Sequence, residues 1–336
     1  MSLYRAETRR LVKRRFTKVL AIGCLAVLAA LVVGTLLTNQ KVGPEAVAAA
    51  RAHADEDYQN ALRETEQQQQ ACVAAQGTDQ APNFPANCAE ITPPNQEDFK
   101  YEWYMPATFS FRTNFPEMMF ALAGILAMGA FVIGASFVGA EWSSGGMMNL
   151  LLWRPQRQRV LGTKLAALLA GVGAFTVVVS AVWTGVFLVV AELNGSTEGM
   201  TSGAWQSIML LELRAVVLVL AAAALGFGLA SLGRHTAVAL GVTVGAIVVL
   251  QFGLATVLVL ARVKFIEAYL IPVWAQAWLD KQVRLEDYES CDFSATRGCL
   301  PDTLTITWQM AGGVLAAVLV LVVGAAMWTI RSRDIT

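Results

Sequence analysis

Six long apolar runs constrain the fold of this chain more than any other feature. Each contains 18 to 26 residues without Asp, Glu, Lys or Arg, and together they are residues 19–38, 118–138, 165–190, 215–232, 237–261 and 310–330. A helix needs about 20 residues to cross the hydrocarbon of a bilayer. Lipid offers no partners for backbone N–H and C=O groups, so such runs are helical. We therefore predict an all-α polytopic membrane protein with six transmembrane helices.

Composition narrows the function classes. Hydrophobic residues make up 56% of the 336 residues and charged residues only 15%, against about a quarter charged in soluble domains. Lys and Arg equal Asp and Glu at 25 each, so nothing favours a nucleic-acid partner. Two histidines and five cysteines offer few ligands for a metal centre, and we expect neither a metal nor a cofactor.

Charge alternates between the connecting segments. One set, formed by the two ends of the chain and the second and fourth connections, carries 14 basic residues against three acids; the other carries 10 against 21. Because Lys and Arg concentrate on the cytoplasmic face, both termini are predicted to be cytoplasmic. Residues 1–18 are expected to form a cytoplasmic interfacial helix, and the first span reads as an uncleaved signal-anchor.

Two large segments are predicted outside the cytoplasm. In the first, residues 39–115, the stretch 44–71 is rich in helix formers and reads as one polar helix, which either caps the spans or docks a partner. In the second, residues 262–307, the apolar stretch 265–279 is too short to cross and is broken by Pro272, so we expect short re-entrant or interfacial helices before the sixth span.

Four of the five cysteines fall on this outer, oxidising side. They are Cys72, Cys88, Cys291 and Cys299. Their location argues for disulfides, and three pairings are possible. We favour Cys72–Cys88 with Cys291–Cys299, which close short loops, over a metal site, because no C-x-x-C spacing is present.

The spans offer little chemistry. Glu212 and Arg214 are two residues apart near the outer end of the fourth helix and cannot face each other; they act either as a gate or as interfacial anchors. Ala237, Gly241 and Gly245 recur every four residues and predict close helix packing, within one chain or between two. No phosphate-binding loop, nucleophile elbow or zinc motif occurs, so we expect no enzyme activity and no ATP hydrolysis by this chain.

The loop 141–164 is the most informative segment. An acid ends the second span, two glycines and a short apolar helix follow, and Arg154, Arg157 and Arg159 form a basic rim before the third span. This loop resembles that of the membrane subunit of ABC-2 type ABC transporters. The resemblance rests on Glu141, Gly145, Gly146, Leu150 to Leu152, Pro155, Arg157, Arg159 and Lys164. Gly146 replaces the usual Thr, and the Pro-to-Lys interval is about one residue shorter than usual.

The resemblance implies a single transmembrane permease domain over residues 1–336, paired as a homodimer, with a separate ATP-binding subunit that docks on the loop 141–164. The uncharged spans favour export of a hydrophobic or amphipathic substrate, such as a drug, an antibiotic or a lipid. The rival interpretation is a membrane sensor or scaffold whose outer loop binds a ligand or partner and which an ATPase regulates. A channel would need polar pore-lining residues, and these are scarce.

Overall fold

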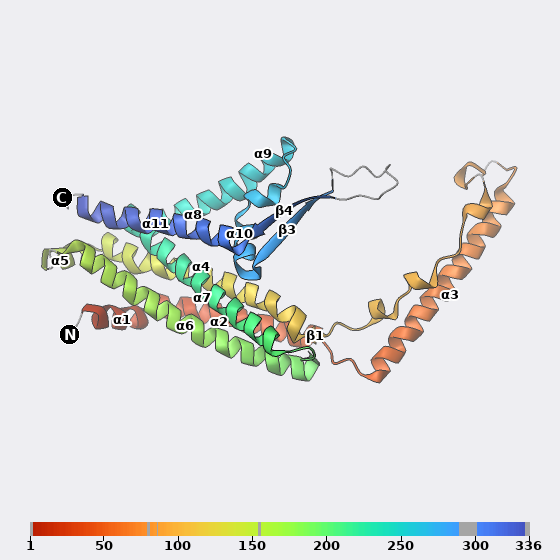
Figure 1. Cartoon of the computed structure of the whole chain (residues 1–336), viewed down its shortest axis with the longest axis horizontal. Helices are drawn as coiled ribbons and strands as arrows, with labels where there is room; N and C mark the ends of the chain where they lie inside the picture. Colours follow the sequence, from red (N-terminus) through yellow and green to blue (C-terminus); the bar gives the residue numbers. More distant parts are fainter. Residues whose placement is uncertain (1–2, 79–80, 86, 154–155, 289–300, 333–336) are drawn as a thin grey trace. The chain divides into compact units, whose positions relative to one another are not determined.

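The computed structural model describes residues 3–78, 81–85, 87–153, 156–288 and 301–332. The chain divides into two compact units (Figure 1). The bundle unit comprises Met1–Val32, Arg112–Phe187 and Gly199–Thr336, and the α3 unit comprises Val33–Phe111 and Leu188–Glu198. Each unit is described by itself.

Six described helices are long and apolar enough to cross a membrane, as predicted. They are α2 (Arg15–Thr38), α4 (Phe111–Ser143), α6 (Arg157–Asn194), α7 (Ser202–Gly233), the run of α8 (Thr236–Ile247), the π-helical turn η5 (Val248–Gly253) and α9 (Leu254–Leu260), and α11 (Trp308–Ser332). Most extend several residues beyond the apolar runs, and α6, with 38 residues, is about 57 Å long. Its ends therefore project past a hydrocarbon core of about 30 Å.

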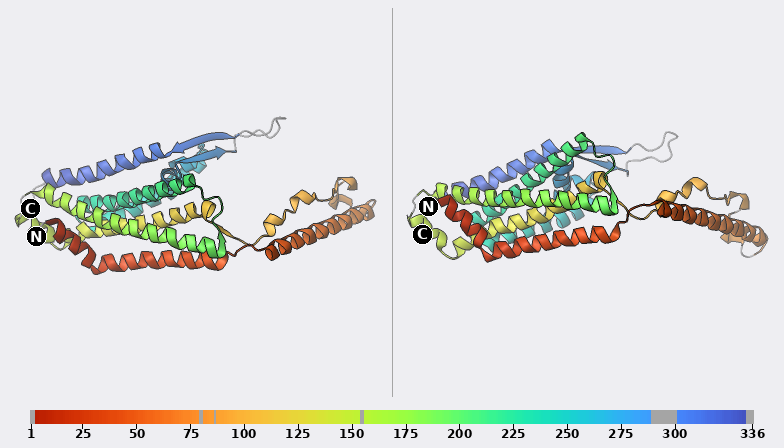
Figure 2. Two further views of the ribbon diagram at one scale, coloured as in Figure 1. Left: turned by 60° about the horizontal axis from the view of Figure 1, so that its bottom comes forward. Right: turned by 90° about the horizontal axis from the view of Figure 1, so that it is seen from below.

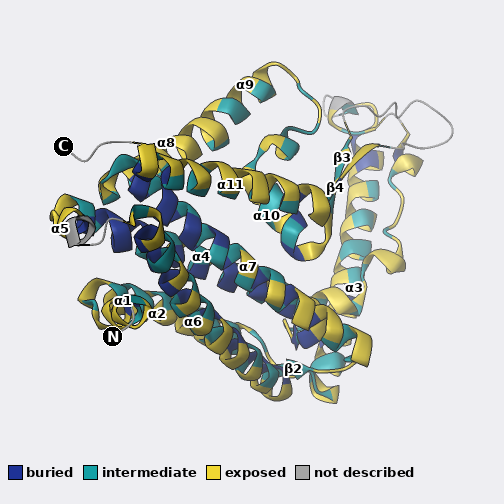
Figure 3. Cartoon of the chain, turned by 60° about the vertical axis from the view of Figure 1, so that its left-hand side comes forward, coloured by how far each residue is buried: buried dark blue, intermediate teal, exposed yellow. Residues whose placement is uncertain are grey.

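Helices α4 and α7 form the centre of the bundle. Half of the apolar window of α7 and 44% of that of α4 are buried, and Figure 3 shows their dark inner faces. Glycines make the approach possible: a methyl group at Gly134 would overlap the carbonyl oxygen of Ala223, and one at Gly226 would overlap that of Phe131. Each of the two helices therefore presents a glycine to a backbone carbonyl group of the other, as in small-residue helix contacts.

The amino-terminal segment is two helices rather than one. Helix α1 (Leu3–Lys13) is followed by Arg14, and α2 begins at Arg15. Helix α1, the short helix α5 (Gly146–Trp153) and the end of α11 lie at the same end of the bundle (Figure 2).

The segment between α9 and α11 departs from the expectation of an all-α chain. The 3-10 turn η6 (Ile266–Tyr269) and α10 (Ile271–Asp280) match the predicted pair of short helices. They are followed by an antiparallel pair, β3 (Gln282–Asp287) and β4 (Asp302–Thr307), which the prediction missed. Ile306 and Ala311 pack with Ala277 of α10, so the pair forms a small apolar core with the end of the last span.

The far end of this strand pair is held by one lysine. Asp287 and Asp302 are direct cross-strand partners, a placement in which like charges repel. The Nζ of Lys264 lies 2.7 Å from Asp302 and 3.9 Å from Asp287. The hydrogen bond to Asp302, together with its charge, raises the pKa of Lys264. The lysine thus offsets the repulsion between the two carboxylates.

The α3 unit is organised by one 32-residue helix, α3 (Pro44–Ala75), four residues longer than predicted. The returning chain forms four 3-10 turns (Ala81–Asn83, Cys88–Glu90, Gln96–Asp98 and Tyr101–Tyr104). Tyr104 donates a hydrogen bond to Asp57 (2.8 Å), which raises the pKa of its phenol, and Tyr58 packs on Phe99 with ring centroids 5.6 Å apart. A two-residue parallel pair, β1 (Phe109–Ser110) with β2 (Gly195–Ser196), completes the unit.

Candidate functional site

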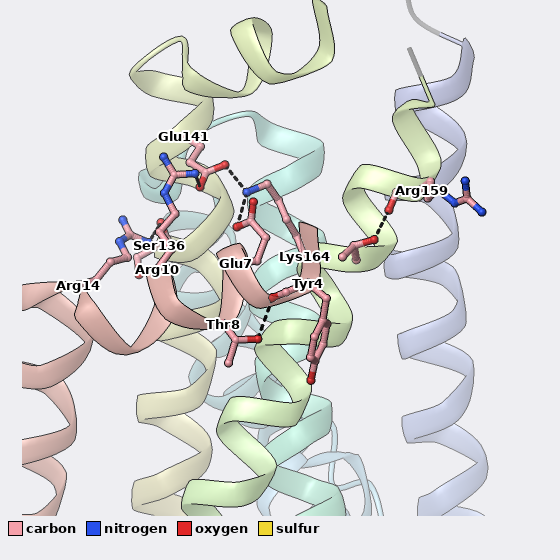
Figure 4. Close-up of polar contacts among 10 residues, drawn as sticks. Tyr4, Glu7, Thr8, Arg10, Arg14, Ser136, Glu141, Arg159 and Lys164 are labelled. Carbon is pink, nitrogen blue, oxygen red and sulfur yellow. Dashed lines mark hydrogen bonds and ion pairs between the residues drawn. The ribbon is translucent and has the colours of Figure 1, made fainter. Parts of the chain in front are cut away.

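The two ends of the loop 141–164 meet in a cluster of buried charges, drawn in Figure 4. Lys164, near the start of α6, lies with its Nζ 2.7 Å from Glu141 at the end of α4. The same Nζ lies 2.8 Å from Glu7 of α1. Arg10, one turn further along α1, lies 2.9 Å from the other oxygen of Glu141. Two acids and two bases from α1, α4 and α6 thus form one charge-balanced cluster, here called the Lys164 cluster.

Burial gives this cluster its energetic weight. None of the Lys164 side chain is exposed, against 4% for Glu7 and 10% for Glu141. Removing such charges from water costs several kcal/mol per ion. The attraction between the partners offsets this cost only when they are close and well aligned. The pairs are therefore weak evidence of net stability but strong evidence of a fixed arrangement. Arg10, with 55% of its side chain exposed, adds less to that arrangement than Lys164 does.

Phe137 forms the floor of the cluster. Its ring is fully buried, with Lys164 Nζ at 5.5 Å and the Arg14 guanidinium at 6.0 Å from its centroid. Arg14 also donates to the carbonyl oxygen of Ser136 (3.1 Å). Burial lowers the pKa of Arg14, and Arg10 adds to that effect while Glu141 opposes it; an arginine nevertheless stays protonated. The break between α1 and α2 is thereby fixed to α4.

A left-handed glycine turns the chain out of α4. Gly145 has φ +72°, a conformation that side chains disfavour, and Gly146 then opens α5. Met147 is fully buried, whereas Met148 is 38% exposed. The predicted short apolar helix is therefore present, with one described methionine turned inward and the next turned outward.

The basic rim is only partly described. Arg157 begins α6 and is half-buried, and Arg159 is exposed and donates to Gln156 (2.9 Å). Arg154 and Pro155 lie outside the described residues. The described part of the rim lies on the first turn of α6, less than two turns before Lys164.

Glu212 and Arg214 contact different helices. Glu212 accepts a hydrogen bond from Thr184 of α6. Arg214 donates to the carbonyl oxygen of Leu279 in α10 (3.2 Å) and lies 5.4 Å from the Trp308 ring centroid. The arginine thus ties α7 to the segment before the last span, and its role as gate or anchor stays a prediction.

The stripe of Ala237, Gly241 and Gly245 packs against nothing described. All three residues are exposed, and a methyl group at Gly241 or Gly245 would meet no atom within 4 Å. Close packing within one chain therefore does not account for the stripe among the described residues. Contact between two chains, the other alternative, stays a prediction.

The cysteines follow the favoured pairing as far as they are described. Cys72 and Cys88 form a disulfide that closes α3 against the returning chain. Cys291 and Cys299 lie outside the described residues. Cys24, in α2, is free.

Glu7 is the residue that sequence reasoning missed. It was counted only as one acid of the basic tail, yet it is one of two carboxylates on Lys164. One signal marked it: it is the sole acid before Glu45, amid seven basic residues. An acid does not contribute to the attraction of a basic helix to an anionic membrane surface, so it is a candidate for a specific ion pair.

Comparison with known proteins agrees with this geometry. The model of the family described as "ABC-2 family transporter protein" matches residues 1–331. No curated protein matches the chain. The match spans α1, all six long helices and the Lys164 cluster. The chain therefore belongs to the ABC-2 family of transporter proteins, as a multi-pass membrane permease subunit that works with an ABC ATP-binding subunit.

Proposed function

We propose that this permease exports a hydrophobic or amphipathic compound, such as a drug, an antibiotic or a lipid, across the plasma membrane. Both termini and the loop 141–164 are cytoplasmic in this proposal, because the basic connections lie on that side. The described spans carry few charges. They therefore have few polar groups that could replace the water molecules bound to a translocating ion or sugar. An apolar or amphipathic cargo makes no such demand.

The Lys164 cluster is the observation that carries the coupling mechanism. An ATPase that docks on α5 and the basic rim would move the loop 141–164. Because Lys164 binds Glu141 and Glu7 together, that displacement reaches α4, α6 and α1 at once. The bundle would then convert between two packed states, with the cargo bound more tightly in the inward-facing one.

A homodimer is part of the proposal. The run α8–η5–α9 has none of its apolar window buried, in contrast to α4 and α7. Its small-residue stripe would let a second copy approach closely. Two permease chains would then enclose the pathway, with one ATPase beneath each.

The coupling role is tested by removing the basic rim. The triple change of Arg154, Arg157 and Arg159 to Ala is expected to abolish co-purification of the ATPase and its substrate-stimulated hydrolysis, while the permease still folds. Arg5, Arg9 and Lys13 are exposed basic residues of α1 at the same end, so changing these three to Ala is the matched control. Unaltered transport by the first variant would refute docking through the rim.

A sensor or scaffold is the alternative function. The α3 unit supports this alternative, because its own disulfide and aromatic contacts hold the unit together. Vesicles that hold the permease and its ATPase distinguish the two functions. ATP-dependent accumulation of an amphipathic dye favours export, whereas binding of a ligand to the α3 unit without any movement of solute favours the sensor.

A further inference from the structure

A cavity of about 220 Å³ lies within the bundle unit, between α2, α4 and α6. Its walls include Ala21 and Cys24 of α2, Gly129 and Ala130 of α4, and Gly171 and Thr176 of α6. An engineered cavity of about 150 Å³ lined by apolar side chains is large enough to hold benzene. This space, here called the α2 cavity, therefore accepts a segment of an alkyl chain.

Glycines let the helices approach closely at the edge of the cavity. A methyl group at Gly129 would lie 2.8 Å from Cys24 Sγ, and one at Gly171 would lie 2.6 Å from Leu11 Cδ2. Helix α2 and the end of α1 therefore lie close against α4 and α6 at these two glycines, with the cavity beside them.

Two threonines, Thr17 and Thr176, line the cavity together with Lys18, and the remaining lining residues are apolar. Thr17 Oγ1 of α2 and Thr176 Oγ1 of α6 are buried, and neither has a hydrogen-bond partner among the described residues. Thr176 as a whole is only 1% exposed. Unpaired buried hydroxyls are costly, and a ligand oxygen would satisfy them. The occupant therefore combines an alkyl chain with an oxygen acceptor, as an acyl ester does.

Positive charge surrounds the same end of α2. Lys18 lines the cavity, and Arg14 and Arg15 precede it by one turn. A lysine at the end of a span reaches the headgroup region with its ammonium while its stem follows apolar surface. An anionic headgroup would be attracted there, whereas a zwitterionic one would be attracted less.

The bilayer itself is the source of such a molecule. On the outward side of α2, Val19 is 69% exposed and Ile22 is 65% exposed. Only 6% of the apolar window of α2 is buried, so α2 stands at the edge of the bundle beside lipid. An acyl chain already next to α2 needs only a small displacement to enter.

We propose that the α2 cavity binds an acyl chain of an anionic phospholipid from the basic side of the membrane, with Lys18 on the headgroup and the two threonine hydroxyls on the ester oxygens. The lipid fills the gap between α2 and the rest of the bundle. This proposal depends neither on ATPase docking nor on the identity of the exported cargo, so it can be tested and refuted separately from the proposed export function.

Photocrosslinking of the full chain tests the site. The protein is reconstituted in phosphatidylcholine vesicles with phosphatidylglycerol that carries a diazirine on one acyl chain, and adducts are located by peptide mass spectrometry. We expect adducts to concentrate on α2, α4 and α6 at the cavity. Lys18→Gln is expected to reduce them about fivefold, and Ala21→Phe, which fills the space, to abolish them. Thr176→Val, which keeps the shape but removes a hydroxyl, should weaken them.

Matched variants separate the site from general lipid contact. Lys13→Gln removes a basic residue that does not line the cavity, and Ala26→Phe adds the same ring on the exposed side of α2; both should leave adducts unchanged. The proposal is overturned if folded Ala21→Phe retains wild-type adducts. It is equally overturned if the same diazirine on phosphatidylcholine labels as strongly, or if native mass spectrometry finds a compound other than a phospholipid held there.

Discussion

Lys164 is a fully buried cation on which two carboxylates depend for charge compensation. It lies between two buried carboxylates, against the fully buried ring of Phe137. Replacing it leaves Glu7 and Glu141 facing each other without a shared cation. Arg10 forms an ion pair with Glu141 but none with Glu7 among the described residues, and it does so from a largely exposed position.

Lys164→Met is therefore expected to destabilise the fold by about 3–5 kcal/mol, the range for breaking a buried ion pair. Arg10→Met is the matched control and should cost less than about 1 kcal/mol, because exposed pairs contribute little. Unfolding in detergent, followed by tryptophan fluorescence, measures both. Adding Glu7→Gln and Glu141→Gln to Lys164→Met should restore part of the loss, and equal effects of the two single changes would contradict the assignment.

Asp280, at the end of α10, gives a prediction that depends on pH. Partial burial raises its pKa, Glu117 adds to the rise, and a hydrogen bond from Gln276 opposes it. A carboxyl group whose pKa is higher in the folded state stabilises fully only below its unfolded pKa, and that stability is lost as pH rises through the folded value. The Tm of Asp280→Asn relative to wild type should therefore increase as the pH rises above about 4, the ordinary pKa of an aspartate. A Tm difference that does not change with pH would contradict this.

At the scale of elements, the exposed stripe on α8 is open to a direct test. Gly241→Leu is expected to lower the dimer fraction several-fold, because an isobutyl group would separate two closely packed helices. Gly124→Leu is the control: that glycine is also exposed, with open space around it, but lies on α4. Cross-linking in membranes reports the dimer fraction. Equal cross-linking of the two variants would remove this face from the interface.

Hydropathy was sufficient to predict the spans, and the helix-forming residues were sufficient to predict α3. Neither pattern predicted which residues of different helices contact one another. Apolar runs of spanning length have one stable form in lipid, and a polar stretch of helix formers after Pro44 has a strong start signal. Glu141 and Lys164 were both singled out, but as parts of a loop. The contact of Lys164 with Glu7 joins residues 157 positions apart, a separation for which no local pattern exists.

The strand pair was missed for a different reason. Alternate residues of β3, Val283 and Leu285, pack inward, so a period of two was present in QVRLED. Three of the other residues in QVRLED are charged, so the alternation of apolar and polar residues is weak compared with the apolar stretch that precedes the strand. The partner strand lies 15 residues further on, and pairing at that distance depends on tertiary contacts such as those of Lys264.

At the scale of the whole molecule, the proposed orientation rests on the charge of the connections and on the disulfide, and each can be tested against the other. In a Cys24→Ser background, Cys72 and Cys88 should react with a membrane-impermeant maleimide added outside the cell, and only after reduction. Arg9→Cys should react only when the reagent reaches the cytoplasm. Labelling of Arg9→Cys from outside would invert the proposed orientation.

The Lys164 cluster also has a consequence for biosynthesis. Glu7 leaves the ribosome 157 residues before Lys164 does, an interval of roughly 10–30 s at about 5–20 residues per second. Over that interval the spans α2 and α4 are made, while Glu7 lacks the lysine that it binds in the folded chain. The contact of α1 with Lys164 therefore forms only once the third span begins, and nascent chains halted before that point should leave α1 open to protease.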